Sequence, residues 1–160
     1  MLTADQIAAA REAARAAGHP GAALSYAIQF EGAVRQWDVK GQWVTLDDRQ
    51  PSAIIYKGKK WIGPTWAHVD ERLILRWTPT KTETTTAPEI VIDLAACPMV
   101  MEELQGVPQS ARNGPLIVNP EKGRPYRSLR RRCTNRPWSL SDSMQGTRVL
   151  YRSCRPAVGR

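Results

Sequence analysis

The sequence is poor in the residues that build cross-linked or metal-bound proteins. It contains three cysteines, Cys97, Cys133 and Cys154, at wide spacing and with no CxxC pair. An odd number at this spacing argues against a disulfide framework and against a zinc site, and it fits a reducing compartment. We therefore expect no structural metal and a cytoplasmic location.

Long apolar runs are also absent. No stretch of about eighteen apolar residues occurs, so we expect neither a membrane span nor a membrane partner. The opening, MLTADQIAAAREAARAAG, has no basic start followed by a hydrophobic stretch, so it is not a secretory signal. With 160 residues, the chain has room for one domain with its own core.

Most of the chain has no excess of positive charge. Residues 1–123 carry 13 lysines and arginines against 14 aspartates and glutamates, a net charge of −1. Residues 124–160 carry ten arginines, no lysine and a single acid, Asp142, a net charge of +9. The basic excess therefore lies at the end of the chain, and composition alone does not make the preceding part a nucleic-acid binder.

Two helices are predicted at the N-terminus. Thr3 is a suitable cap for the first helix, which alanine, glutamate and arginine carry as far as Gly18. Pro20 starts the second helix at a favoured first position, and apolar residues at helical spacing continue to Phe30. The alanine-rich first helix is expected to cover a core rather than form one.

The most regular strand pattern lies at residues 71–94. Two runs rich in β-branched and aromatic residues, 73–77 and 90–94, flank a polar connection that contains Pro79, Lys81 and five threonines. This pattern predicts a β-hairpin with a long loop and with Lys81 near its tip. Residues 61–66 are predicted to form a third, neighbouring strand.

The remaining segments complete an α+β prediction. Residues 41–60 read as a loop or extended insertion with a short strand at 53–56, and residues 97–104 as a short amphipathic helix. A brief extended run is expected at 114–119 and a turn at 121–126. The predicted fold is therefore a set of helices packed on a small three-stranded antiparallel sheet.

Several segments together resemble the catalytic domain of tyrosine recombinases, the phage-type integrases. Residues 34–38 (VRQWD) are similar to the Arg-x-x-Glu/Asp segment that opens this domain, and Thr80-Lys81-Thr82 to its (Ser/Thr)-Lys-Thr hairpin turn. Order and spacing agree over roughly residues 20–127, and five segments in family order are more specific than any one alone. The other similar segments are 64–69, 116–119 and 123–126.

The resemblance implies a chemistry for these positions. Tyrosine recombinases cut double-stranded DNA by attack of a tyrosine on a phosphodiester, without metal or ATP, so no cofactor is expected. By resemblance Arg35 meets the charge of the reacting phosphate, Lys81 is the general acid for the leaving 5′-oxygen, and Asp38 supports the local helix. The plainer interpretations are a surface ion pair worth less than about 1 kcal/mol and a solvated loop lysine.

The same resemblance implies a DNA partner and a place in the cell. We expect double-stranded DNA as the partner, with assembly of several copies on it as an open alternative, in a bacterial cytoplasm near the nucleoid. Lys57, Lys59 and Lys60, with Thr80 and Thr82, are candidate DNA contacts. For the three lysines, a role in keeping a loop soluble is an equally good interpretation.

The other aromatic and histidine residues are weaker candidates for a functional role. Five tryptophans lie in apolar contexts, so we expect them to pack in the core or on strands rather than to stack on bases. These are Trp37, Trp43, Trp61, Trp66 and Trp77. His68 is expected to be structural.

The last residues depart from the family pattern. Residues 128–160 contain no histidine, hence no His-x-x-Arg segment, and Tyr151 lacks the motif that precedes the nucleophile. The abrupt shift to Arg, Ser, Pro and Cys is typical of a GC-rich gene read out of frame, and we favour this interpretation. The alternative is a basic arm that binds nucleic acid. We expect residues 1–127 to be a partial catalytic domain and residues 128–160 a disordered Arg-rich tail.

Three hypotheses follow for the whole chain. It is a truncated integrase-like protein of DNA recombination, inactive alone; or a nucleic-acid-binding module that works through its basic tail; or an α+β domain with coincidental motifs. About twenty residues precede the resemblance, so we do not expect the separate N-terminal DNA-binding domain of the family.

Overall fold

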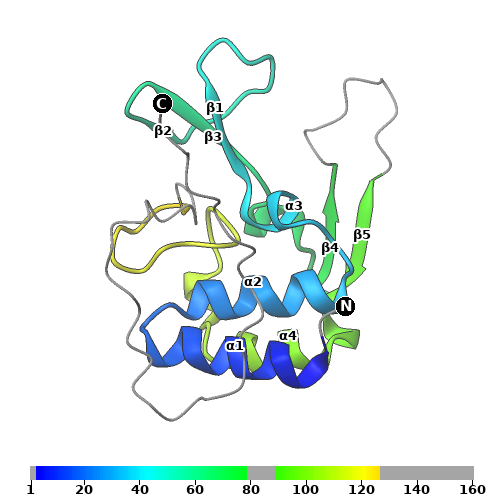
Figure 1. Cartoon of the computed structure of the whole chain (residues 1–160). Coiled ribbons are helices and arrows are strands. Elements are labelled where there is room, and N and C mark those ends of the chain that lie inside the picture. Colours follow the sequence, from blue (N-terminus) through cyan, green and yellow to red (C-terminus); the bar gives the residue numbers. More distant parts are fainter. Residues whose placement is uncertain (1–2, 79–88, 127–160) are drawn as a thin grey trace, which may run out of the picture. The chain divides into compact units, whose positions relative to one another are not determined.

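A computed structural model describes residues 3–78 and 89–126 of the chain (Figure 1). In this part, α-helices span Ala4–Ala16 (α1), Pro20–Glu31 (α2), Gln36–Lys40 (α3) and Pro98–Gln105 (α4). Strands span Gln42–Thr45 (β1), Ile55–Tyr56 (β2), Lys59–Ile62 (β3), Ile74–Trp77 (β4) and Ile90–Asp93 (β5). Short 3-10 turns lie at Trp66–His68 (η1), Leu94–Ala96 (η2) and Gln109–Ala111 (η3). The predicted α+β class is confirmed.

The first two helices begin where the sequence predicts. The hydroxyl of Thr3 accepts a hydrogen bond from the amide of Gln6 at 3.3 Å, and the Gln6 side chain accepts from the amide of Thr3 at 3.0 Å. This reciprocal capping box satisfies amides that would otherwise lack partners at the helix start. Pro20 is the first residue of α2, and Gly18 reverses the chain between the helices with a φ of 76°.

The strands form two antiparallel sheets rather than one. The larger sheet has the order β1-β3-β2, and β4 pairs with β5 in a two-stranded hairpin. The prediction that residues 61–66 lie beside the hairpin as its third strand is wrong, because Trp61 and Ile62 belong to β3 and pair with β1. Strand propensity predicts that a segment is a strand but not which strand it pairs with. Here the pairing strand is β1, which the sequence did not predict.

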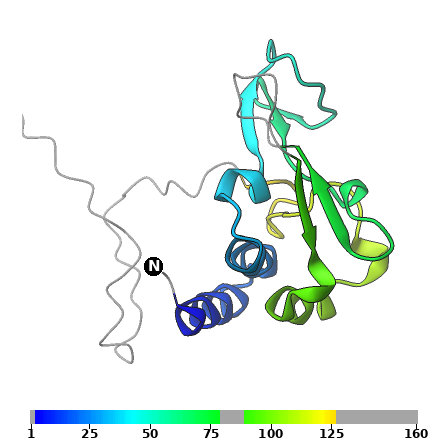
Figure 2. The same ribbon diagram turned by 90° about the vertical axis from the view of Figure 1, so that its right-hand side faces the viewer.

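Helix α2 is the central helix of the described part. It packs against both α1 and α4, and Figure 2 shows α1 and α2 nearly end-on beside α4. Its buried face meets apolar residues from α3, both hairpin strands, α4 and the 114–117 segment. This core consists of Leu24, Ala27, Ile28, Val39, Trp66, Leu75, Ile92, Leu94, Cys97, Val100, Leu104, Leu116 and Ile117.

A buried ionic cluster ties the first helix to the last one. Arg11 of α1 is 3% exposed, and its guanidinium donates to Glu103 at 2.7 Å, to Glu102 at 2.7 Å and to the carbonyl of Met99 at 3.1 Å. Arg15 donates to the same Glu103 carboxylate. The Arg11 charge is therefore compensated inside the protein, as burial of a guanidinium requires.

A glycine sets the exit from α3 into the larger sheet. Gly41 has a φ of 70°, and a Cβ atom at this position would lie 2.5 Å from the Trp61 ring. Only glycine fits both the backbone conformation and the space. β1 therefore starts directly against β3, and the larger sheet extends from the end of α3.

Some predictions fall on residues that the structure does not describe. These are the hairpin connection at 79–88 and the predicted disordered tail at 128–160. Both lie outside the described residues and stay predictions.

Candidate functional site

Arg35 lies on the short connection between α2 and α3. It precedes the first residue of α3 with extended dihedrals (φ −72°, ψ 153°), and its carbonyl accepts from the amide of Asp38 at 3.0 Å. Its side chain is exposed. Within residues 3–78 and 89–126, no ion pair joins Arg35 to Asp38 or to another side chain. The guanidinium is therefore not committed to any group in the described part of the chain.

Apolar contacts on both sides hold the Arg35 connection in place. Val34 packs against the core and Val39 is 1% exposed within it. A Cβ atom built on Gly32 would lie 2.8 Å from the Cδ1 atom of Ile92, so the end of α2 touches strand β5 closely. Arg35 is thus an exposed cation on a connection whose neighbouring residues pack into the core and against strand β5.

The hairpin itself is formed, and its connection carries the other predicted catalytic residue. Trp77 pairs with Ile90 as the last pair of the β4–β5 ladder. The sequence between these residues contains Thr80, Lys81 and Thr82, which lie outside the described residues. Their approach to Arg35 therefore stays a prediction.

The three candidate lysines of the larger sheet have different environments. Lys57 and Gly58 form the two-residue turn between β2 and β3, with φ values of 48° and 68°, which are typical of a type I′ hairpin turn. Lys57 and Lys59 are exposed, whereas Lys60 is buried and its ammonium donates to the Asp48 carbonyl. Lys60 therefore holds the loop after β1, while the other two lysines face solvent.

Lys57 belongs to a cluster that the sequence did not predict. The Arg124 guanidinium lies 3.6 Å from the centre of the Tyr56 ring, and the Lys57 ammonium lies 5.6 Å from the same centre. The Trp43 ring meets Tyr56 edge-on, with centroids 6.2 Å apart. The only local signal was the Lys-Gly pair between two strand-like runs, because the contact with Arg124 depends on the tertiary fold.

The tryptophans of the described part range from buried to exposed, and Trp43 and Trp77 are partly buried. Trp61 and Trp66 are 2% and 8% exposed, as the apolar contexts predict, but Trp37 is 55% exposed on the first turn of α3. Trp37 therefore does not pack in the core. His68 is structural as predicted: its Nδ1 atom accepts from the Thr65 amide at 3.0 Å, and its ring packs against Trp77.

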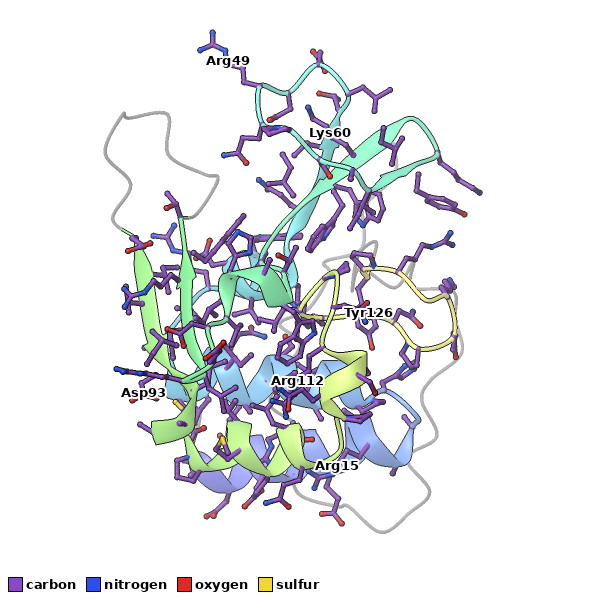
Figure 3. The ribbon with its side chains drawn as sticks, turned by 180° about the vertical axis from the view of Figure 1, so that it is seen from behind. Arg15, Arg49, Lys60, Asp93, Arg112 and Tyr126 are labelled. Atoms are coloured by element: carbon purple, nitrogen blue, oxygen red, sulfur yellow. The ribbon has the colours of Figure 1, made fainter. Side chains whose placement is uncertain are left out.

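Lys40, at the end of α3, is a buried cation that the sequence did not indicate. It is 5% exposed, its Nζ atom has no hydrogen-bond partner among the described residues, and it lies 5.0 Å from the centre of the Tyr26 ring. Burial disfavours the charged form and lowers the pKa of Lys40 to about 8. Figure 3 shows the side chains of the described part, with Tyr126 labelled on the 114–126 segment and Arg49 pointing away from the helices.

Neither a metal centre nor a membrane segment emerges from the described residues. They contain no group of three or more His, Cys, Asp or Glu side chains arranged to hold a metal ion. None of their helices has the length and apolar character needed to cross a bilayer.

The site therefore consists of one exposed arginine beside a hairpin and one cluster of cations on the larger sheet. A cationic arrangement without a metal-ligand group is suited to binding an anion through charge-assisted hydrogen bonds. Comparison of the chain with protein-family models, with curated proteins and with solved structures found no match.

Proposed function

We propose that the chain is a DNA-binding, integrase-like protein related to the catalytic domain of tyrosine recombinases, and that it cannot cleave DNA alone. In this proposal Arg35 and Lys81 contact one DNA phosphate. The nucleophilic tyrosine and the His-x-x-Arg segment of the family are absent from the sequence. Binding without cleavage is what the remaining residues support.

The placement of Arg35 carries the proposal. A structural arginine is normally paired, as Arg11 is with Glu103 at 2.7 Å, whereas Arg35 is exposed and has no ion pair in the described part. It is also held beside the hairpin whose connection contains Lys81. An exposed guanidinium without an ion pair in the described part can donate to a phosphate without first breaking an internal contact.

The proposal is tested by the salt dependence of duplex binding. Each phosphate contact that is lost lowers the slope of log K against log salt by about 1. We expect Arg35→Ala and Lys81→Ala each to lower the slope of the full chain by this amount. The matched control is Arg72→Ala, which removes an exposed arginine from the turn before β4, at the opposite end of the hairpin from its connection.

The effects of the two substitutions should also depend on each other. If Arg35 and Lys81 contact one phosphate, the double variant loses less than the sum of the single losses. Equal slopes for Arg35→Ala, Lys81→Ala and Arg72→Ala would contradict the proposal.

A second candidate function rests on the charge distribution. Residues 124–160 carry ten arginines and one acid, so a basic-tailed nucleic-acid-binding module is the alternative. Comparing the full chain with a version that ends at Arg127 separates the two. The alternative requires that truncation abolish binding and that Arg35→Ala have no effect in the full chain.

A further inference from the structure

The larger sheet presents a cation held flat on an aromatic ring. The Arg124 guanidinium lies 3.6 Å from the centre of the Tyr56 ring, the separation of a stacked pair. Stacking fixes the plane of the guanidinium, whose N–H groups point outward along its edges. Both residues are only partly buried, so these edges are near the surface.

A closed turn holds the backbone of Arg124. The Asn119 carbonyl accepts from the amides of Lys122 at 3.2 Å and Gly123 at 2.9 Å, and the Asn119 amide donates to the Arg124 carbonyl at 2.9 Å. The Asn119 side chain also accepts from the amide of Glu121 at 3.0 Å. Arg124 is therefore positioned by the fold before any ligand arrives.

The strand register brings further cations to the same face. Tyr56 pairs directly with Lys59, so the two side chains project from one side of the sheet. Lys57 follows Tyr56 in the turn, with its ammonium 5.6 Å from the centre of the same ring. Lys57, Lys59 and Arg124 thus lie around one partly buried aromatic residue.

These three cations are not neutralised by carboxylates of the described residues. All ion pairs found there join Arg11 or Arg15 to Glu102 or Glu103. Two acids do lie near the sheet, Asp47 and Asp48, in the loop after β1. The buried Lys60 faces that loop, and its ammonium donates to the Asp48 carbonyl. A hydrogen bond with Thr45 is the main cause that lowers the pKa of Asp47, and the charge of Lys60 is a lesser cause.

The pKa of the Tyr56 hydroxyl indicates that the local electrostatic potential is positive. Burial would raise the pKa of this phenol, but hydrogen bonds and charge from Arg124, together with Lys57, outweigh burial and place the pKa below its usual value. A surface that favours a phenolate favours other oxyanions for the same reason. A phosphodiester is an oxyanion that accepts from a guanidinium through two oxygens at once.

We propose that Tyr56, Lys57, Lys59 and Arg124 form a second DNA-backbone contact, separate from Arg35, in which the stacked Arg124 binds a phosphodiester group. This inference rests on the proposed DNA-binding function. In this inference the β1-β3-β2 sheet binds the DNA backbone at a place separate from the β4–β5 hairpin. Contacts to phosphates fix position and orientation without reading sequence.

The test is a binding titration with random-sequence duplex DNA at several salt concentrations. The full chain carries Arg130, Arg131 and Arg132→Gln in every sample, which lowers the contribution of the arginine run. We expect Arg124→Ala to lower the salt slope by about 1 and to weaken binding several-fold at low salt. Lys122→Ala is the matched control, since it removes one exposed charge from the same turn.

Two further variants distinguish a stacked contact from diffuse charge. Arg124→Lys keeps the charge and loses the planar fork, and Tyr56→Leu removes the ring and keeps every cation. We expect both to weaken binding more than Lys122→Ala, with circular dichroism and thermal melts confirming that each variant is folded. If both bind like the Lys122→Ala protein, the stacked contact is excluded.

The outcomes separate this inference from the proposed function. If Arg124→Ala matches Lys122→Ala while Arg35→Ala still lowers the slope, the sheet contact is overturned and the proposed function stands. If only Arg124→Ala lowers the slope, the sheet contact stands and the role of Arg35 falls. An equal loss of affinity for polyglutamate on Arg124→Ala would overturn the assignment to a phosphodiester.

Discussion

At the scale of single residues, Lys40 combines a charge with an apolar environment. Within the described part of the chain its ammonium has no hydrogen-bond partner, and it lies over the Tyr26 ring, an interaction that replaces only part of the hydration lost on burial. The pKa of Lys40, about 8 against 10.5 for an ordinary lysine, is lowered because the lost hydration is a deficit that the protein does not fully replace. The deficit makes Lys40 a source of pH-dependent stability.

We expect the free energy of unfolding to rise between pH 8 and pH 10.5. Over this window the unfolded chain binds the Lys40 proton more tightly than the folded chain, so raising the pH favours the folded state. Below pH 8 both states are protonated and stability is lowest; the full gain is about 3 kcal/mol. Urea unfolding at pH 7.5 and at pH 10 measures it.

The Lys40→Met protein isolates this effect. It should be more stable than the parent at pH 7.5 and should lose most of the rise toward pH 10. Burial raises the pKa of Tyr126 to about 12, which works in the opposite direction above pH 10 but is common to both proteins. A Lys59→Met protein, altered at an exposed lysine, should keep the parental rise; an equal rise in all three would refute the assignment to Lys40.

The Arg11 cluster predicts a large loss from one substitution and a small loss from another. Glu103→Ala should lower the free energy of unfolding by about 3 kcal/mol, because it leaves the buried Arg11 charge without its buried partner. Glu102→Ala removes a carboxylate whose side chain is 63% exposed and should cost less than about 1 kcal/mol. Chemical denaturation at pH 7 checks both values.

Replacing the buried pair together is the control. An Arg11→Met, Glu103→Leu double variant removes both charges and fills the space with apolar atoms, so it should recover most of the loss. If the double variant were no more stable than Glu103→Ala, lost packing rather than an unpaired charge would explain the result.

At the scale of elements, α2 caps α4 through a side chain rather than through the residue before α4. Cys97 precedes α4 and makes no side-chain capping bond. Instead, the carboxylate of Glu31, at the end of α2, accepts from the amides of Met99 at 3.2 Å and Val100 at 3.1 Å. The negative charge also lies at the positive end of the α4 dipole.

Glu31→Ala should therefore destabilise the protein by about 1–2 kcal/mol, since two helix amides lose their acceptor. Glu31→Gln keeps one acceptor oxygen and loses the charge, so a smaller loss is expected. Glu12→Ala, at an exposed position of α1, should have little effect on thermal unfolding. A loss for Glu31→Ala no larger than that for Glu12→Ala would rule out the capping role.

Local chemistry made the helices and the hairpin predictable. Thr3 and Pro20 mark helix starts by capping and by ring geometry, and the runs at 73–77 and 90–94 pair as predicted. Strand β1 was missed because its partner is the lysine-rich β3, whose polar residues resemble a loop. The Lys57–Gly58 turn was a local signal only for the pairing of β2 with β3.

The candidate site likewise has one part that could be predicted from the sequence and other parts that could not. The exposed position of Arg35 at a helix start follows from its neighbours, because Val34 and Val39 turn inward. The stacking of Arg124 on Tyr56 could not be predicted, since it joins distant parts of the chain and depends on how the 119–124 turn packs. The burial of Lys40 had no local signal either.

At the scale of the whole molecule, we expect the chain to bind DNA without cleaving it. Incubation with a nicked suicide DNA substrate should give a non-covalent complex and no covalent band on a denaturing gel. Catalytic constellations are strongly non-additive, so two cationic members without nucleophile, second arginine and histidine supply little of the full rate. A covalent band that disappears in Tyr151→Phe would reverse this conclusion and make the C-terminal residues functional.

The Arg11–Glu103 contact also orders events during synthesis of the chain. The two residues are 92 positions apart, so at about 5–20 residues per second Arg11 is made roughly 5–20 s before its partner. Until Glu103 is made, the Arg11 guanidinium has no buried carboxylate to pair with and stays in water. We therefore expect the buried ionic cluster, and with it the docking of α1 onto α4, to form only after α4 has emerged from the ribosome.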